Sequence, residues 1–140
     1  MARQPPTQLQ HGDSRGRGDA GGRWIRKFAA AGRGVGRAVW SEASFRVHLP
    51  VAAGALAAGA FFRIEPVEWA LVTLAIGGVL AAELLNSAIE QLARGPGTRR
   101  HPRLRDALDI ASGGVLVAAA AAVVVGLLIF LPRLLELLGA

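Results

Sequence analysis

The chain has 140 residues, enough for one domain, and 52% of them are hydrophobic, with a mean hydropathy of +0.38. This hydrophobic share exceeds that of ordinary soluble domains. Cysteine is absent, which excludes a disulfide framework and thiolate chemistry. The formal charge of +6 is concentrated before Val47 and in residues 94–105, beside apolar runs. It therefore indicates membrane topology and anionic lipid headgroups as partners, and no nucleic acid.

The first part of the chain changes character at Arg23. Residues 1–22 are rich in Gly, Arg, Gln, Pro and Asp without an apolar period, so they predict a disordered basic tail. Over residues 23–46, apolar side chains led by Trp24 and Phe28 recur on one helical face and arginines on the other. This pattern is typical of an amphipathic helix on a membrane surface. The GRGVGRA segment within it lacks the Lys-Ser/Thr ending of a phosphate-binding loop, and small residues on a surface helix explain it.

Glu42 interrupts the apolar face of this helix. It follows Trp24 by 18 residues, or five whole turns, and so lies at the centre of that face. A carboxylate in this place needs a partner. One hypothesis is that the helix end frays and Glu42 pairs with Arg46 one turn later. The other is that Glu42 points at a polar site formed further along the chain.

Three apolar runs predict three membrane spans. Ile110–Leu131 is 22 residues without a charge, long enough at 1.5 Å per residue for the roughly 30 Å hydrocarbon layer. Val47–Phe62 and Trp69–Ala82 are shorter and need their polar ends at the interface or inside a bundle. The expected spans are about 47–64, 67–92 and 106–131, the last ending before Pro132, with 132–140 as a C-terminal end.

Two alternatives to a membrane protein are excluded. A soluble three-helix bundle cannot cover 22 consecutive uncharged residues on all sides. A secretory leader does not fit, because about 46 residues precede the first apolar run. Arginines gather before the first run and between the second and third runs, which predicts a cytoplasmic N-terminus in a multi-pass protein of the bacterial cytoplasmic membrane.

The segment ELLNSAIE, residues 83–90, places ionisable groups inside an apolar helix. At 100° per residue, Glu83, Asn86 and Glu90 fall within an arc of about 60°. Charged groups at membrane depth are costly, and by default they face a partner and mark a functional site. Several carboxylates with a carboxamide oxygen suit a hard cation such as Mg²⁺, which uses one or two carboxylates together with substrate phosphates. Phosphoryl transfer needs such an arrangement.

Other metal chemistry has little support. His48 and His101 have no His or Cys neighbours at the spacing of zinc ligands, so each is interpreted as a hydrogen-bonding residue at the interface. Asp109, Ser112 and Gly113 follow one face at the start of the third span. Glu83, Asn86 and Glu90 form a polar stripe on their helix. This polar stripe, Glu42 and the groups at the start of the third span are expected at one depth, where a water-soluble reactant and a lipid headgroup can meet.

The chain resembles the small prokaryotic membrane lipid kinases, diacylglycerol kinase and undecaprenol kinase, over about residues 23–135. The resemblance is carried by EASFRVH at 42–48, ELLNSAIE at 83–90 and DIASGGVLVAA at 109–119. It implies an all-α homotrimer, with three spans and a surface helix in each subunit and active sites between neighbouring chains. The implied reaction is phosphorylation of a lipid hydroxyl by ATP with Mg²⁺. The FRVH motif at residues 45–48 is closer to the undecaprenol kinase branch.

By position, the resemblance implies a role for each matching residue. Glu83 is the implied general base, and Glu42 and Glu90 are the implied Mg²⁺ ligands. Ser112 is implied to contact the lipid headgroup together with Glu83. The residues implied to bind the nucleotide are Arg23, Glu42, Asn86, Glu90, Arg99, Arg100, His101, Arg105 and Asp109.

One position departs from the family pattern. Leu108 stands where the family has lysine before the aspartate, so a cation expected beside the phosphates is missing. Arg105, one turn earlier, is expected to supply that charge, although Arg and Lys differ in geometry and hydration. Two other functions stay open: a degenerate homologue that only assembles, and a small ion or proton pathway. A pathway should place ionisable groups across the whole membrane.

Overall fold

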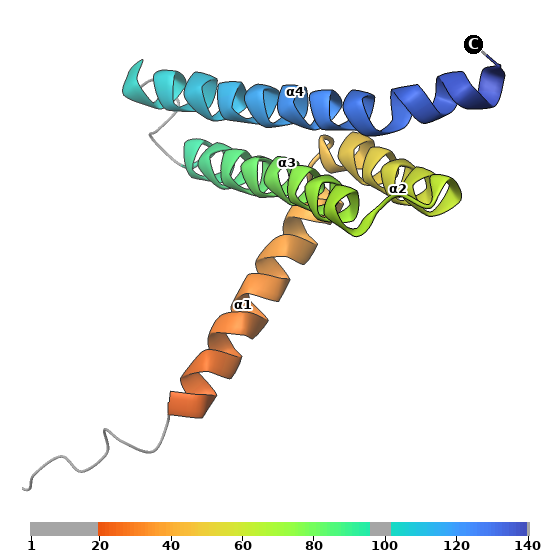
Figure 1. The fold of residues 1–140 in the computed structure, drawn as a ribbon. Helices are drawn as coiled ribbons and strands as arrows, with labels where there is room; N and C mark the ends of the chain where they lie inside the picture. Colours follow the sequence, from red (N-terminus) through yellow and green to blue (C-terminus); the bar gives the residue numbers. More distant parts are fainter. Residues whose placement is uncertain (1–19, 96–101, 140) are drawn as a thin grey trace, which may run out of the picture. The chain divides into compact units, whose positions relative to one another are not determined.

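The computed structural model describes residues 20–95 and 102–139, and within these ranges every regular element is an α-helix. The all-helical prediction is confirmed. Three of the helices are long and apolar enough to cross a membrane, which agrees with the three predicted spans. The homotrimer remains a prediction. The helices in chain order are α1 (Ala20–Ser41), α2 (Phe45–Phe62), α3 (Pro66–Ala93) and α4 (Pro102–Leu138) (Figure 1).

The chain divides into two compact units, residues 1–34 and 35–140. The described part of the first unit is the beginning of α1, which is strongly amphipathic. Its aromatic residues Trp24 and Phe28 are exposed, with ring centroids 6.3 Å apart. The Lys27 ammonium lies 5.0 Å from the Trp24 ring centroid, within cation–π range. Exposed aromatic rings beside basic residues suit a helix that lies at a membrane interface.

The surface helix ends earlier than the predicted boundary at residue 46. Glu42 still donates its backbone N–H to Ala38, but α1 stops at Ser41, and a new helix begins at Phe45. Phe45 is 2% exposed, the most deeply buried large side chain among the described residues. The sequence pattern had assigned Phe45 to the surface helix. The break after Ser41 instead lets its ring enter the core of the second unit.

A tight turn joins α2 to α3. Arg63 has φ 49° and ψ 51°, the left-handed conformation that commonly ends helices, and Ile64 donates its N–H to the carbonyl of Gly59. The next helix starts with Pro66, while the Glu68 carboxylate accepts a 2.8 Å hydrogen bond from the backbone N–H of Glu65. This turn makes α2 and α3 an antiparallel pair.

The core near this turn depends on one glycine. Ile64, Val72 and Ile129 form the buried cluster, and Trp69 packs against it. A Cβ atom added at Gly59 would lie 3.0 Å from a methyl carbon of Ile64 and 3.0 Å from the Trp69 ring. Gly59 therefore permits close contact between the helix backbone and these two side chains.

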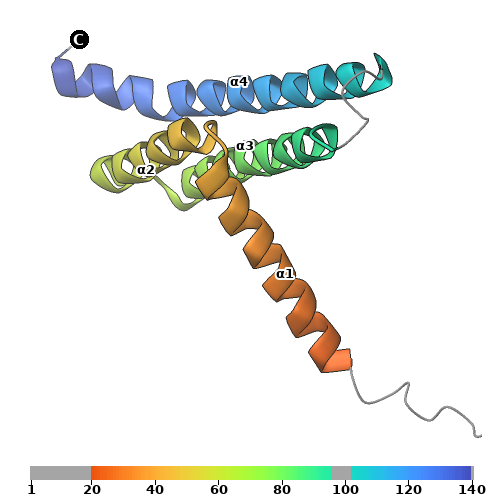
Figure 2. The ribbon, with the colours of Figure 1, turned by 180° about the vertical axis from the view of Figure 1, so that it is seen from behind.

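α4 is longer than the predicted third span. Figure 1 and Figure 2 show, from opposite sides, that α4 runs alongside α3, with its first residues beside the end of α3. The third span was predicted to end before Pro132, whereas the helix itself continues through Pro132 to Leu138. Proline cannot donate a backbone hydrogen bond to the preceding turn. In that turn, Arg133 donates a 2.6 Å side-chain hydrogen bond to the carbonyl of Ile129, and a second bond joins it to Glu68 at 2.8 Å.

The distribution of side chains is the reverse of a soluble protein. Large apolar residues such as Leu74, Leu85 and Leu116 are more than two-thirds exposed. The buried residues in the second half of α3, by contrast, are mainly polar. A membrane favours this pattern, in which apolar side chains face the surroundings and polar side chains lie inside the protein. The polar residues are therefore expected to have a function.

Candidate active site

The deepest carboxylate belongs to Glu83, which is 3% exposed. Its Oε1 lies 2.9 Å from Nε2 of His48, which comes from the first turns of α2. Its other oxygen, Oε2, is buried and has no hydrogen-bond partner among the described residues. Native structures leave few buried polar atoms unpaired, and each one calls for an explanation. Here the carboxylate has one oxygen bonded and one oxygen free.

The polar stripe continues along α3 toward its C-terminal end. Asn86, also buried, donates a 2.9 Å hydrogen bond from Nδ2 to Oε1 of Glu90. On the other side, its Oδ1 lies 3.5 Å from the hydroxyl of Ser112 on α4, a long contact. The Ser112 hydroxyl makes its shorter bond, 2.9 Å, to the carbonyl of Leu108. Asn86 thus links the stripe of α3 to the first part of α4.

Glu42 joins the same end of the bundle from outside α3. It is 8% exposed, and its Oε1 accepts a 2.9 Å hydrogen bond from the Gln91 side chain. Arg94 contacts both Glu42 oxygens at 3.4 and 3.5 Å and bonds to Glu90 at 3.1 Å. Two carboxylates distant in sequence therefore share one guanidinium. Arg94 caps the C-terminal end of α3, where the helix dipole also favours a cation.

The structure decides between the two hypotheses for Glu42. Its ion pair is with Arg94 and not with Arg46, whose side chain is exposed. Glu42 was expected to point at the same polar site as Glu83 and Glu90. It shares the Arg94 guanidinium with Glu90, whereas the Glu83 carboxylate bonds to His48. Within residues 20–95 and 102–139 of the single chain, no three His, Asp or Glu side chains group closely enough to hold a metal ion.

Three further predicted residues are exposed, and three others lie outside the described residues. Arg105 and Asp109 are exposed on α4, and Arg23 is exposed on α1. Arg99, Arg100 and His101 fall outside the described residues, so their predicted roles rest on the resemblance alone. The structure brings together Glu42, Asn86, Glu90 and Ser112 through a chain of side-chain contacts, with Glu83 two turns deeper.

Three contacting residues were missed by the sequence analysis as parts of the site: His48, Gln91 and Arg94. Arg94 follows Glu90 by four residues, and this spacing on a helix is a readable signal for an ion pair. Gln91 and His48 had no such signal, because their partners are 49 and 35 residues away in sequence. Their contacts depend on how the helices pack.

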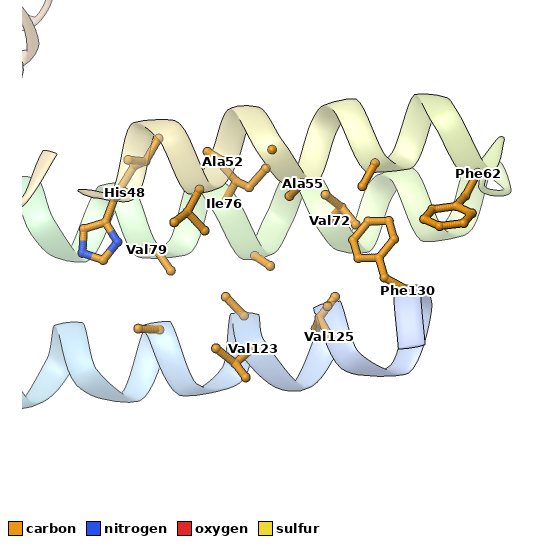
Figure 3. Close-up of a pocket in the computed structure, with 18 of the residues that line it drawn as sticks. His48, Ala52, Ala55, Phe62, Val72, Ile76, Val79, Val123, Val125 and Phe130 are labelled. Atoms are coloured by element: carbon orange, nitrogen blue, oxygen red, sulfur yellow. The ribbon is translucent and has the colours of Figure 1, made fainter. Parts of the chain in front are cut away.

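An apolar cleft leads away from His48 between α2 and α3 on one side and α4 on the other (Figure 3). Its volume is about 600 Å³, in the usual range for a ligand pocket. Phe62 and Phe130 lie at the far end from His48 (Figure 3). Among the described residues that line it, His48 alone has a polar side chain. The cleft therefore suits a hydrocarbon chain, and its one polar contact adjoins Glu83.

Three candidate membrane spans, buried carboxylates at one end of the bundle and an adjoining apolar cleft suit a membrane enzyme that acts on an amphiphilic substrate. Comparison with known proteins makes this specific. The family model for prokaryotic diacylglycerol kinase matches residues 29–130. The chain therefore belongs to the prokaryotic diacylglycerol kinase family and is a membrane lipid kinase.

Two curated relatives agree with this assignment. An undecaprenol kinase from Bacillus subtilis is 38% identical over 112 residues, which cover 80% of this chain and 91% of that protein. A diacylglycerol kinase from Synechocystis is 35% identical over 112 residues, which cover 79% of this chain but 64% of the relative. No solved structure matches the chain.

Proposed function

We propose that this kinase transfers the γ-phosphate of ATP, with Mg²⁺, to the hydroxyl of a membrane lipid at the cytoplasmic surface. The observation that carries the proposal is Glu83, a buried carboxylate in a helix that is long and apolar enough to span a membrane, with Oε2 unpartnered among the described residues. A buried carboxylate next to an apolar cleft is suited to accept a proton from an alcohol that water does not reach. A general base must lie within hydrogen-bond reach of the proton it takes.

The donor set at the end of α3 supports a magnesium site. Glu42 and Glu90 offer two carboxylates around one guanidinium, and Mg²⁺ uses one or two carboxylates and completes its shell with phosphates and water. When bound, Mg²⁺ would hold the nucleotide phosphates and neutralise the charge that develops on them. Asn86 holds the Glu90 carboxylate in place by a hydrogen bond. Glu83, two turns deeper on the same face, is left for the lipid.

The acceptor is a long-chain alcohol lipid. The two relatives are named for undecaprenol and diacylglycerol, and the undecaprenol kinase matches over more of its length. Both lipids present one hydroxyl at the end of a hydrocarbon body, which agrees with a cleft that is apolar except at His48. We propose undecaprenol as the first substrate to test and diacylglycerol as the second.

The first experiment tests Glu83. Purified protein in mixed micelles is given ATP, Mg²⁺ and either lipid, and phosphate transfer is measured with labelled ATP. We expect Glu83→Gln to reduce turnover by at least about 100-fold, because an amide cannot take the proton. The control is Glu136→Gln, which neutralises an exposed carboxylate near the end of α4 and should leave turnover unchanged. Full activity of Glu83→Gln would reject the assigned base.

A pathway for ions or protons has less support. Between Glu83 and the opposite end of the bundle, where Glu68 pairs with Arg133, the helices contribute the apolar cleft and the core around Val72. A proton relay needs ionisable groups in sequence across this region. A degenerate homologue is the remaining alternative, and failure of the wild-type chain to phosphorylate any lipid in a panel would favour it.

A further inference from the structure

Among the described residues, His48 connects the apolar cleft to the buried carboxylate of Glu83. Its Nε2 lies 2.9 Å from Oε1 of Glu83, and the two side chains are 23% and 4% exposed. It also lines the cleft, at the end opposite Phe62 and Phe130 (Figure 3). No other described residue that lines the cleft contributes a polar side chain. Any alcohol that reaches Glu83 from the cleft therefore passes His48.

We propose that His48 is the positioning residue of Glu83: its hydrogen bond fixes one carboxylate oxygen so that the other faces the lipid hydroxyl. The inference rests on the proposed lipid kinase function and adds a residue to that site. An ionised carboxylate only accepts hydrogen bonds, so the ring nitrogen bonded to Glu83 carries the proton. His48 then acts as a hydrogen-bond donor through Nε2.

The geometry gives the reason for this role. A carboxylate on a glutamate side chain rotates about its terminal bond, and this torsion is broad unless a partner restricts it. His48 is the hydrogen-bond donor to Glu83 within the described chain, so it sets this rotation. Because Oε2 has no partner, it is the oxygen left for the substrate. Preorganised groups of this kind contribute to rate by avoiding reorientation during the reaction.

In the step that His48 supports, the lipid O–H bond breaks and its proton moves to Oε2 of Glu83. The lipid oxygen forms a bond to the γ-phosphorus of ATP. The bond between that phosphorus and the bridging oxygen breaks, and ADP leaves with the electron pair. His48 keeps its proton on Nε2 and stays bonded to Oε1 throughout.

The test compares two substitutions of His48. Glutamine places an amide N–H close to the position of Nε2, whereas leucine fills the space without a donor. With saturating lipid and ATP in mixed micelles, we expect kcat of His48→Leu to fall by about 100-fold, the effect of a small misplacement in an active site. His48→Gln should retain kcat within about 5-fold, and KM for ATP should change in neither variant.

A double-mutant cycle separates positioning from general damage to the fold. In single-turnover measurements, His48→Leu should cause no further loss in a Glu83→Gln background, since the group that it positions is already inactive. Equal losses in both backgrounds would overturn the inference. So would full activity of His48→Leu, or a His48→Gln variant as slow as His48→Leu. A wild-type chain that phosphorylates no lipid would instead reject the proposed function itself.

Discussion

Arg94 holds two carboxylates that the proposed magnesium ion would need. Its guanidinium contacts Glu42 at 3.4 Å and Glu90 at 3.1 Å, and its side chain is about half exposed. An exposed ion pair of this kind contributes roughly 0–1 kcal/mol. Arg94 is thus a weak resident counter-ion that competes with a divalent cation for the same oxygens.

We therefore expect Arg94→Gln to strengthen divalent-cation binding. Removal of a competing pair worth up to about 1 kcal/mol corresponds to an approximately 2- to 5-fold lower dissociation constant. Titration of the nucleotide-free protein with Mn²⁺, followed by electron paramagnetic resonance, measures this constant. Arg46→Gln is the matched control, because it removes an exposed arginine one turn from Glu42 that is not its partner. A larger decrease in the dissociation constant for Arg46→Gln than for Arg94→Gln would indicate that Glu42 pairs with Arg46 instead.

For single residues, the sequence predicted the polar stripe of α3 but not the side-chain contacts between helices. Glu83, Asn86 and Glu90 were placed on one face by helical periodicity alone, and Glu83 and Asn86 are among the most buried polar residues described. The contact of His48 with Glu83 depends on the register of α2 against α3, which periodicity within one helix does not give. The grouping of three carboxylates was expected, but the single chain brings two of them to one guanidinium.

Among the helices, the contact between α2 and α3 depends on Gly59. A methyl group there would lie about as close to Ile64 and to the Trp69 ring as real Cβ atoms ever come, at 3.0 Å. We expect Gly59→Ala to lower the free energy of unfolding by about 1–3 kcal/mol, the usual cost of overpacking a core. Gly54→Ala, in the same helix but with open space around an added Cβ, is the control and should be neutral or slightly stabilising, because alanine favours a helix over glycine.

This difference is measured by unfolding each variant in mixed micelles with increasing sodium dodecyl sulfate, followed by tryptophan fluorescence. Equal stability of the two variants would show that Ile64 and Trp69 move aside at little cost. The sequence alone does not distinguish Gly59 from Gly54. Both stand in a small-residue stretch of the first span, and only the packing of α3 distinguishes them.

Helix ends were the least predictable part of the fold. The third span was expected to end before Pro132, but α4 continues to Leu138. The effect of proline on a helix is local, whereas Arg133, the next residue, joins this part of α4 to α3 through its bond to Glu68. Phe45 likewise starts α2 because its ring is buried. The existence of the helices followed from apolar runs, whereas their ends followed from tertiary contacts.

For the molecule as a whole, the charge distribution predicts orientation. Arg63, between α2 and α3, stands beside Glu65 and Glu68, whereas most other arginines lie before α2 or between α3 and α4. By the positive-inside rule, we expect the Arg63 turn to lie outside and the N-terminus to lie in the cytoplasm. The proposed site near Glu42 and Glu90 would then face the cytoplasmic supply of ATP.

Because the chain has no cysteine, single-cysteine variants test this orientation directly. In intact cells, we expect Arg63→Cys to react with a membrane-impermeant maleimide and Ser41→Cys to react only after the membrane is opened. Inverted vesicles should exchange the two results. Labelling of Ser41→Cys in intact cells would contradict the orientation and, with it, the proposed supply of nucleotide to the site.

Only Arg63, Ile64 and Glu65 separate α2 from α3, and Ile64 is already buried against Val72 and Ile129. A connection of three residues leaves too little chain for α2 to cross the bilayer alone while α3 is still being synthesised. We therefore expect the two helices to enter the membrane together as a hairpin, with Arg63 at its tip. Such a paired insertion would bring His48 of α2 to the Glu83 carboxylate before α4 is made, and leave Asn86 to meet Ser112 when α4 follows.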